Sequence, residues 1–246
     1  MNKMDKMDKM DKFEQIYLIG KGYLVNKLKP FLIKLAERNN LKFEHYSNSQ
    51  NCSVLNGSLR KKLDFKNTLL IFGEFHSTQY NSIHMEELDF LLKYQAIEIF
   101  AKKSSKFNNK IIFLNSMKSI LKTKRSEFDK LYIKYNKKVL KLSKKYKNVY
   151  NILLPYIIDI DILDKPNTIF EKIKNKEITE KDLNNDLIPL QIFNQFQRKF
   201  TELIDEILII KYTEINIFSF EYKYIFAKDF INLYYNLKEK YEENNK

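Results

Sequence analysis

Glycine is scarce in this chain and is confined to the first third of it. The 246 residues contain four glycines, Gly20, Gly22, Gly57 and Gly73, whereas average usage is about 7%. Each lies at or near the end of a short run of residues typical of a strand. A chain with so little glycine is expected to keep it where a side chain does not fit: at a positive φ, in a tight turn, or where the backbone closely approaches another group.

The first two glycines separate a strand-like segment from a helix-like one. The sequence Ile16-Tyr-Leu-Ile-Gly20-Lys-Gly22 leads from an apolar strand into a helical pattern that begins at Leu24. In such a unit the first glycine permits a sharp turn, and the second lets the backbone approach a pyrophosphate at the positive end of the helix. This layout is typical of a dinucleotide-binding βα unit, although Val25 occupies the place of its third glycine.

Strand-like and helix-like segments alternate along most of the chain. The expected strands are 15–19, 42–46, 52–55, 68–72, 111–114, 150–154 and 214–220, and the expected helices are 24–39, 82–102, 128–146, 169–174, 190–210 and 227–241. The alternation predicts an α/β fold with a Rossmann-like, doubly wound parallel sheet.

We expect three parts along the chain. Residues 1–12 repeat Met-Asp-Lys and read as a low-complexity extension. Residues 13–158 are predicted to form a Rossmann-like NAD(P)-binding domain. Residues 159–246, where the pattern is less regular, are predicted to form a small mixed C-terminal lobe on the substrate side of the sheet.

Composition narrows the class of partner. The formal charge of +13 invites a nucleic-acid interpretation, but only four of the 44 basic residues are arginine and few aromatics accompany the lysines. We therefore expect a solvated basic surface that attracts anionic small molecules, not a nucleic-acid groove. The sequence has no apolar run of about 20 residues, no signal-peptide pattern and one cysteine, Cys52, which predicts a cytoplasmic protein without a membrane span.

The order of the later segments resembles one enzyme family. The strand Leu69-Leu-Ile-Phe-Gly73 is followed by the segment Lys110-Ile-Ile-Phe-Leu-Asn-Ser116, by Tyr132 on a helix, and by Asn151-Ile-Leu-Leu-Pro155. From Glu14 to about Tyr241 this order is similar to that of the extended short-chain dehydrogenases/reductases. These are the epimerases, dehydratases and reductases of nucleotide-linked sugars.

The resemblance implies a catalytic set. In this family a tyrosine moves a hydroxyl proton, a serine orients the substrate oxygen, and a lysine four residues after the tyrosine lowers the phenol pKa and holds the cofactor ribose. Tyr132 and Ser116 match the tyrosine and the serine, whereas the lysine is replaced by Asn136. An asparagine can hydrogen-bond a ribose but supplies no charge. Tyr132 could equally be an ordinary aromatic residue of an amphipathic helix.

The resemblance also implies a cofactor, NAD or NADP. The expected cofactor-binding residues are Gly20, Gly22, Tyr23, Leu24, Gly57, Gly73 and Pro155. The choice between NAD and NADP is left open, because Glu44 lies within the second strand and not at its end. No metal site is expected, since His45, His76 and His84 lack the spacing of metal ligands.

Two functions remain open. The chain is either an NAD(P)-dependent enzyme that acts on a nucleotide-linked sugar, or a degenerate relative that keeps the fold and serves as a binding or assembly subunit. Val25, Asn136, the short Ser116–Tyr132 spacing and the lack of an arginine before Pro155 favour the second. By resemblance, a homodimer would form through helices 82–102 and 128–146.

Overall fold

The computed structural model divides into two compact units, Met1–Leu153 with Phe200–Ser219, and Leu154–Lys199 with Phe220–Lys246. The structure describes residues 12–20, 22–46, 66–73, 108–116, 127–159, 169–177, 187–209, 217–220, 223–226 and 229–244, together with 91, 94–95, 98–99, 101–102 and 179. The predicted boundary after residue 158 stays a prediction. Residues 200–219, which it assigns to the C-terminal lobe, belong to the first unit.

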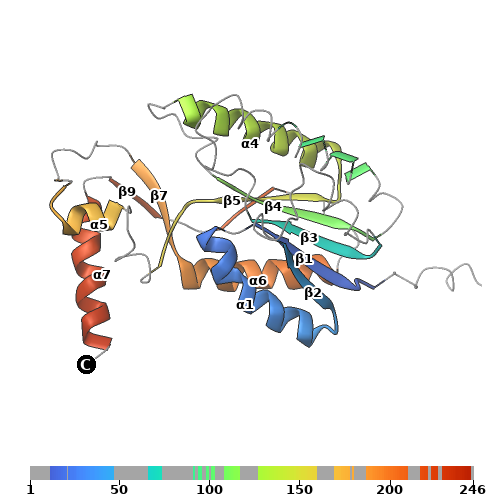
Figure 1. Ribbon diagram of the computed structural model, residues 1–246, viewed down its shortest axis with the longest axis horizontal. Helices are drawn as coiled ribbons and strands as arrows, with labels where there is room; N and C mark the ends of the chain where they lie inside the picture. Colours follow the sequence, from blue (N-terminus) through green and yellow to red (C-terminus); the bar gives the residue numbers. More distant parts are fainter. Residues whose placement is uncertain are drawn as a thin grey trace, which may run out of the picture. The chain divides into compact units, whose positions relative to one another are not determined.

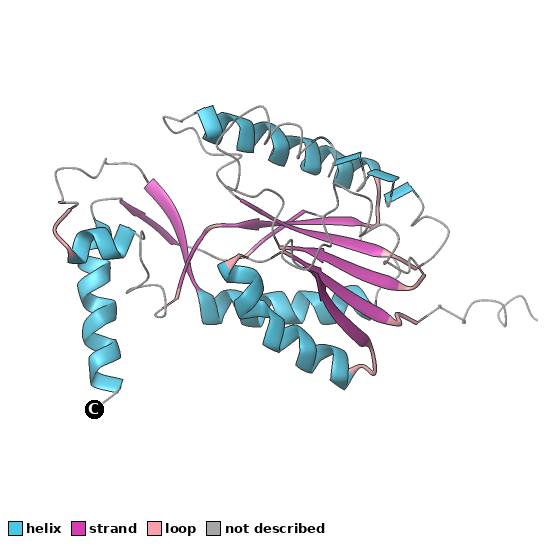
Figure 2. Ribbon diagram, viewed as in Figure 1, coloured by secondary structure: helices cyan, strands magenta, loops and turns pink. Residues whose placement is uncertain are grey.

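A six-stranded sheet forms the centre of the first unit (Figures 1 and 2). Its order is β2-β1-β3-β4-β5-β8, and the registers recorded for its neighbouring strands are parallel. The strands are β1 (Gln15–Ile19), β2 (Lys42–Tyr46), β3 (Thr68–Phe72), β4 (Lys110–Ser116), β5 (Val149–Leu154) and β8 (Ile217–Ser219). The sheet confirms the predicted α/β, Rossmann-like fold class, and the first three strands have the predicted bounds.

Helices cover both faces of this sheet. Figure 1 shows α1 (Tyr23–Arg38) and α6 (Phe193–Ile209) on one face and α4 (Glu127–Lys145) on the other. The central strands β1 and β3 are buried along their whole length, which explains why all their residues after the first are apolar or aromatic. Residues 91, 94–95, 98–99 and 101–102 are helical, within the helix predicted over 82–102, whereas the predicted strand 52–55 lies outside the described residues.

A buried cluster fills the α4 face of the sheet. Alternate residues of β1, β3 and β4 pack there against α4, because successive strand residues point to opposite faces. The cluster includes Tyr17, Ile19, Leu70, Phe72, Ile111, Phe113, Tyr135, Val139, Leu142 and Val149. Helix α4 carries its apolar residues at helical spacing and so can bury one face while the other stays in water.

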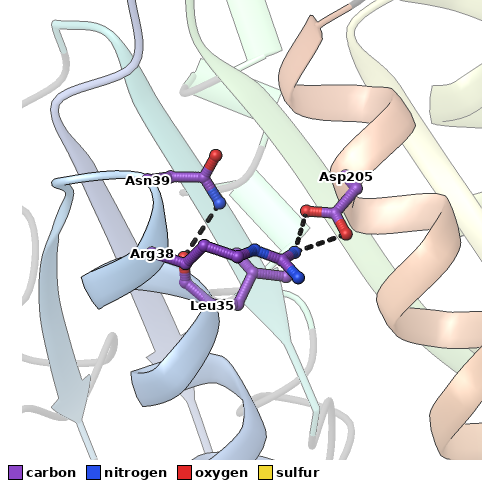
Figure 3. Close-up of polar contacts among 4 residues, drawn as sticks. All are labelled: Leu35, Arg38, Asn39 and Asp205. Carbon is purple, nitrogen blue, oxygen red and sulfur yellow. Dashed lines mark hydrogen bonds and ion pairs between the residues drawn. The ribbon is translucent and has the colours of Figure 1, made fainter.

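A surface ion pair joins the two helices of the opposite face. Arg38 Nη2, in the last turn of α1, donates hydrogen bonds to Asp205 Oδ1 at 2.6 Å and Oδ2 at 2.5 Å on α6 (Figure 3). Asn39 ends α1, and its side-chain Nδ2 donates to Leu35 O at 2.9 Å. The side chain of Arg38 is 60% exposed, so the pair adds little stability.

The second unit contains a three-stranded sheet in the order β6-β7-β9, with β6 parallel and β9 antiparallel to β7. Its elements are β6 (Tyr156–Ile158), α5 (Ile169–Lys174), β7 (Leu187–Ile192), β9 (Lys223–Phe226) and α7 (Phe230–Asn244). The prediction was wrong at two places here. Residues 190–192, predicted to be helical, belong to strand β7, and α6 starts at Phe193. Helix α7 starts three residues later than predicted.

Candidate functional site

The strand order of the sheet reverses between β1 and β3. The chain runs from β1 to β2 on one side and returns to β3 on the other side of β1. The carboxyl ends of these two strands are joined by a hydrogen bond from Gly73 N to Ile19 O at 2.9 Å. In open parallel sheets, ligands bind at this point of reversal, outside the carboxyl ends of the strands.

Gly20 makes the turn that follows β1. Its φ of 128° is a conformation that glycine adopts and other residues rarely do. The turn is held on both sides of the residue: Gly20 N donates to Tyr46 O at 2.9 Å, and His45 Nε2 lies 2.7 Å from Gly20 O. His45 is thus a structural contact of the turn. The backbone conformation at position 20 is enough to explain why this residue is a glycine.

Gly22 is the N-cap of α1, and its backbone needs no glycine. Its φ of −64° and ψ of 168° are open to any residue. Among the described residues no side chain caps this helix end, and the first turn, which begins with the half-buried Tyr23 and Leu24, carries no acidic residue. Exposed N–H groups and the helix dipole make such an end favourable for an anion.

Val25 packs into the space that the missing side chain of Gly73 leaves between α1 and the sheet. Val25 occupies the position of the third glycine and is fully buried. A Cβ added to Gly73 would lie 2.3 Å from Val25 Cγ2, closer than two carbon atoms can approach. The small residue that allows close packing here therefore follows β3, and the larger one is on the helix.

Glu44 is engaged within its own strand. One carboxylate oxygen pairs with Lys42, and the other accepts a hydrogen bond from the Tyr46 hydroxyl. Burial acts to raise the pKa of Glu44, but the hydrogen bonds from Lys42 and Tyr46 and the charge of Lys42 outweigh it and hold the pKa below its ordinary value. The choice between NAD and NADP stays open.

The predicted catalytic residues lie at the end of β4 and along α4. Ser116 is the last residue of β4, and Tyr132 lies in α4 one turn before Asn136. The side chains of Ser116 and Tyr132 lie outside the described part of the structure. Asn136 is 3% exposed, and among the described residues its Nδ2 has no hydrogen-bond acceptor. Asn109, at the opposite end of the sheet, also has an unpartnered Nδ2, so such an atom does not identify a site by itself.

Two buried amides near Asn136 were not predicted from the sequence. Asn115 precedes Ser116, and Asn151 lies on the neighbouring strand β5; they are 4% and 0% exposed. Asn115 Nδ2 lies 3.4 Å from both Asn136 O and Asn151 Oδ1. The available signal was a polar residue interrupting each of two otherwise apolar strands.

Two of the predicted cofactor-binding residues, Gly57 and Pro155, are not placed relative to the glycine turn. Gly57 lies outside the described residues. Pro155 is buried and belongs to the second unit, whereas the turn belongs to the first. The site therefore consists, as far as it is described, of the turn at Gly20–Gly22, Gly73, and the α4 segment with Asn136.

The described ranges contain neither a membrane-spanning helix nor a metal cluster. No helix there is long and apolar enough to cross a membrane. No group of three histidine, cysteine, aspartate or glutamate side chains lies close enough together there to hold a metal ion.

The predicted homodimer stays a prediction. The outer face of α4, through which it would form, carries exposed lysines: Lys130, Lys134, Lys137, Lys141, Lys144 and Lys145. Like charges facing each other across an interface are unfavourable, so this face disfavours a symmetric contact between two copies of α4.

Comparison with known proteins gives structural matches only. No protein-family model matches the sequence, and no curated protein matches it significantly. A dTDP-4-dehydrorhamnose reductase from Clostridium acetobutylicum is 13% identical, with a TM-score of 0.60 over 92% of this chain and 81% of that one. The Bordetella bronchiseptica enzyme WbmG, solved with NAD and UDP, is 10% identical, with a TM-score of 0.64 over 91% of this chain and 78% of that one.

A third match is the L780 UDP-rhamnose synthase of Acanthamoeba polyphaga mimivirus. It is 12% identical, with a TM-score of 0.53 over 86% of this chain and 77% of that one. The sequence identities are too low to carry an activity across, but the structural similarity establishes the architecture. The predicted resemblance is confirmed at that level: the chain has the fold of the extended short-chain dehydrogenases/reductases.

Proposed function

We propose that this protein binds NAD or NADP at the carboxyl ends of β1 and β3 and acts as an oxidoreductase, epimerase or dehydratase on a nucleotide-linked sugar. The observation that carries the proposal is Gly22. The backbone at Gly22 would accept any residue, yet a glycine stands at a helix N-terminus that no side chain in the described part of the chain caps. A glycine kept without a conformational need fits a close approach of the backbone to a ligand.

The residues present fit a dinucleotide. The turn from Gly20 to Gly22 and the first turn of α1 at Tyr23 and Leu24 would hold the pyrophosphate, whose negative charge suits the helix N-terminus. The exchange of volume between Val25 and Gly73 keeps α1 close to the sheet, which is the packing role of the missing third glycine. When bound, the cofactor supplies a nicotinamide that gives or takes a hydride.

Three side chains are proposed for the chemistry. Tyr132 exchanges a proton with the substrate hydroxyl, Ser116 hydrogen-bonds the substrate oxygen, and the Nδ2 of Asn136 donates to the cofactor ribose. The unpartnered Nδ2 supports the last role, because a ribose hydroxyl would satisfy a buried donor that costs about 1–3 kcal/mol when left alone. Asn136 carries no charge that could stabilise a Tyr132 phenolate, so we expect the reaction to be slow.

The substrate class rests on the comparisons. A dTDP-sugar reductase and a UDP-rhamnose synthase are among the structures that share the fold. A nucleotide-linked hexose is therefore the proposed substrate class, and which sugar it carries is left open.

A second candidate is a binding or assembly subunit without catalysis. Position 136 favours it: the residue is buried and neutral where the family has a lysine. The two candidates share the cofactor site and differ only in turnover. Turnover is measured with UDP-, dTDP- or GDP-linked hexoses plus NAD(P)H or NAD(P)+. A rise in rate on Asn136→Lys would show that the native α4 site is impaired.

The test of cofactor binding uses Gly22. NADH and NADPH are titrated into the wild type and Gly22→Ser, with cofactor fluorescence as the readout. Serine is a favourable N-cap, so the variant should keep its thermal stability, while its hydroxymethyl group would occupy the approach of the pyrophosphate and weaken binding at least about tenfold, or about 1.4 kcal/mol. Absence of wild-type binding to both cofactors at millimolar concentration, or equal affinity of the variant, would overturn the proposal.

A further inference from the structure

Four buried polar side chains lie where α4 packs on β4 and β5. Asn115, Asn136, Ser143 and Asn151 are each 4% exposed or less. Elsewhere on this face the same strands and helix present apolar residues such as Ile111, Phe113 and Val149 to the core. Asn115 lies at the carboxyl end of β4, beside Ser116 of the candidate site, and Asn151 is the third residue of β5.

These groups connect both strands to the helix. Asn151 Nδ2 donates to Ser143 Oγ at 2.5 Å and lies 3.4 Å from Val139 O, and Ser143 Oγ donates to Leu140 O at 2.9 Å. Asn115 Nδ2 lies 3.4 Å from Asn136 O. A helical carbonyl has a second lone pair, so it can accept such a bond without giving up its bond within the helix.

The attachment points define the position of the helix. Residues 136, 139 and 143 lie on one face of α4, at spacings of three and four residues, and they span about 10 Å along its axis at 1.5 Å per residue. Apolar contacts are not directional and tolerate small shifts along or about the axis. Directed contacts at several points on one face oppose both kinds of shift.

Stability alone does not call for this cluster. Exchanging both members of a buried hydrogen-bonded pair for apolar groups of the same shape is often nearly neutral. Another buried amide provides a comparison within the same sheet: Gln15, at the amino end of β1, donates from Nε2 to Thr68 Oγ1 at 2.9 Å and accepts from the Tyr17 hydroxyl at 2.8 Å. Those contacts join strand residues to each other and do not involve α4.

We propose that Asn115 is a positioning residue, which together with Asn151 fixes the register of α4 on the sheet and so sets where Tyr132 and Asn136 stand relative to Ser116. Asn115 is adjacent to Ser116 in β4, and the carbonyl it approaches belongs to Asn136, one turn from Tyr132. The functional part of this inference rests on the proposed cofactor site, whereas the anchoring of α4 does not.

The experiment compares the wild type with Asn115→Leu, which keeps the volume and removes the donor, and with Gln15→Leu as the matched control. Amide hydrogen exchange over residues 136–143 is measured first. Asn115→Leu should exchange at least about tenfold faster there, and Gln15→Leu should not. Equal protection in the wild type and Asn115→Leu would overturn the proposal, whatever the protein binds.

The second readout is the dissociation constant for NADH, measured on the same proteins. Asn115→Leu should bind at least about fivefold more weakly, or about 1 kcal/mol, while Gln15→Leu keeps the wild-type affinity. Asn115→Ser, which retains a short donor, should lie between them and serves if the leucine variant does not fold. Unchanged affinity in both Asn115 variants would overturn the positioning role. If the wild type binds no NADH, the proposed function fails, and hydrogen exchange still decides the anchoring.

Discussion

The two halves of the candidate site depart from the family pattern in different ways. At the glycine turn, Val25 stands where a glycine is usual, and Gly73, directly after β3, provides the space that Val25 fills. At α4, Asn136, a buried neutral amide, stands where a lysine is usual.

The difference lies in what each position must supply. The third glycine supplies only space, and space can be moved from one element to its neighbour as long as the total volume is kept. The lysine supplies a charge at a defined point beside the tyrosine, which a neutral amide cannot replace. A packing requirement can be met by exchange between two residues, whereas a chemical requirement is met by the right group or not at all.

The largest expected effect tests the chemical half. Tyr132→Phe removes the hydroxyl that is proposed to move a proton and should lower turnover of a nucleotide-linked hexose at least about 100-fold. NADH affinity should stay within about twofold, since the phenol is not proposed to hold the cofactor. Steady-state kinetics and NADH titration of the same protein measure both. Unchanged turnover would make Tyr132 a structural aromatic residue.

The next effect arises at Lys110, outside both halves of the candidate site. In any pH series it must be separated from effects that arise at the site. Lys110, at the amino end of β4, is 3% exposed, and its Nζ donates to Ile207 O at 2.5 Å in the last turn of α6. Burial lowers the pKa of Lys110 from 10.5 to about 8. Between these values the unfolded chain binds the proton and the folded protein does not, so stability should rise with pH.

The rise should amount to at most about 3 kcal/mol over this range, at 1.36 kcal/mol per pKa unit. Urea denaturation at pH 8 and pH 10.5 measures it. Tyrosines titrate in the same range, so the wild type is compared with Lys110→Met, which should lack this part of the rise. Parallel pH profiles for the two proteins would show that Lys110 titrates at its ordinary pKa.

A smaller effect tests the packing half. Gly73→Ala brings a methyl group against Val25 Cγ2 and should lower the free energy of unfolding by about 1–3 kcal/mol. Adding Val25→Ala removes the opposing methyl groups and should restore much of that loss, with a coupling of at least about 1 kcal/mol in the double-mutant cycle. Urea denaturation of the four proteins gives the coupling. Additive effects would mean that the two residues do not exchange volume.

The smallest effect gives a surface control. Arg38→Ala breaks the exposed pair with Asp205 and should cost at most about 1 kcal/mol. It should leave NADH affinity unchanged, because the pair lies at the C-terminal end of α1 and the glycine turn at the other. Thermal unfolding and NADH titration measure both. A loss of affinity would mean that both ends of α1 affect binding.

Much of the first unit could be predicted from the sequence, because its central strands β1, β3 and β5 are short, mostly apolar runs that are buried. The strands β1, β2 and β3 were predicted with their observed bounds, and β4 and β5 to within two residues. The short strands β6, β7 and β9 were missed. A strand of three to six residues is stabilised by partners distant in the sequence, as Leu187 is by Phe226, and no local pattern shows that pairing.

The candidate site was predictable in its backbone and less so in its contacts. The glycine at position 20 predicts a turn. In the structure its φ is 128°, a value that few other residues tolerate. The roles proposed for Ser116, Tyr132 and Asn136 stay predictions. The contacts of Asn115 with Asn136 and Asn151 join residues 21 and 36 positions apart, which periodicity does not reveal.

The sequence by itself determined the alternating α/β pattern, the glycine turn before α1 and the neutral residue at position 136. These are local properties: hydrophobic period, backbone freedom and side-chain charge are carried by single residues or short segments. Only the tertiary structure decided why Gly73 is a glycine and what the buried amides contact. Both depend on how closely separate elements approach each other, and that distance is set by packing and not by any one segment of the chain.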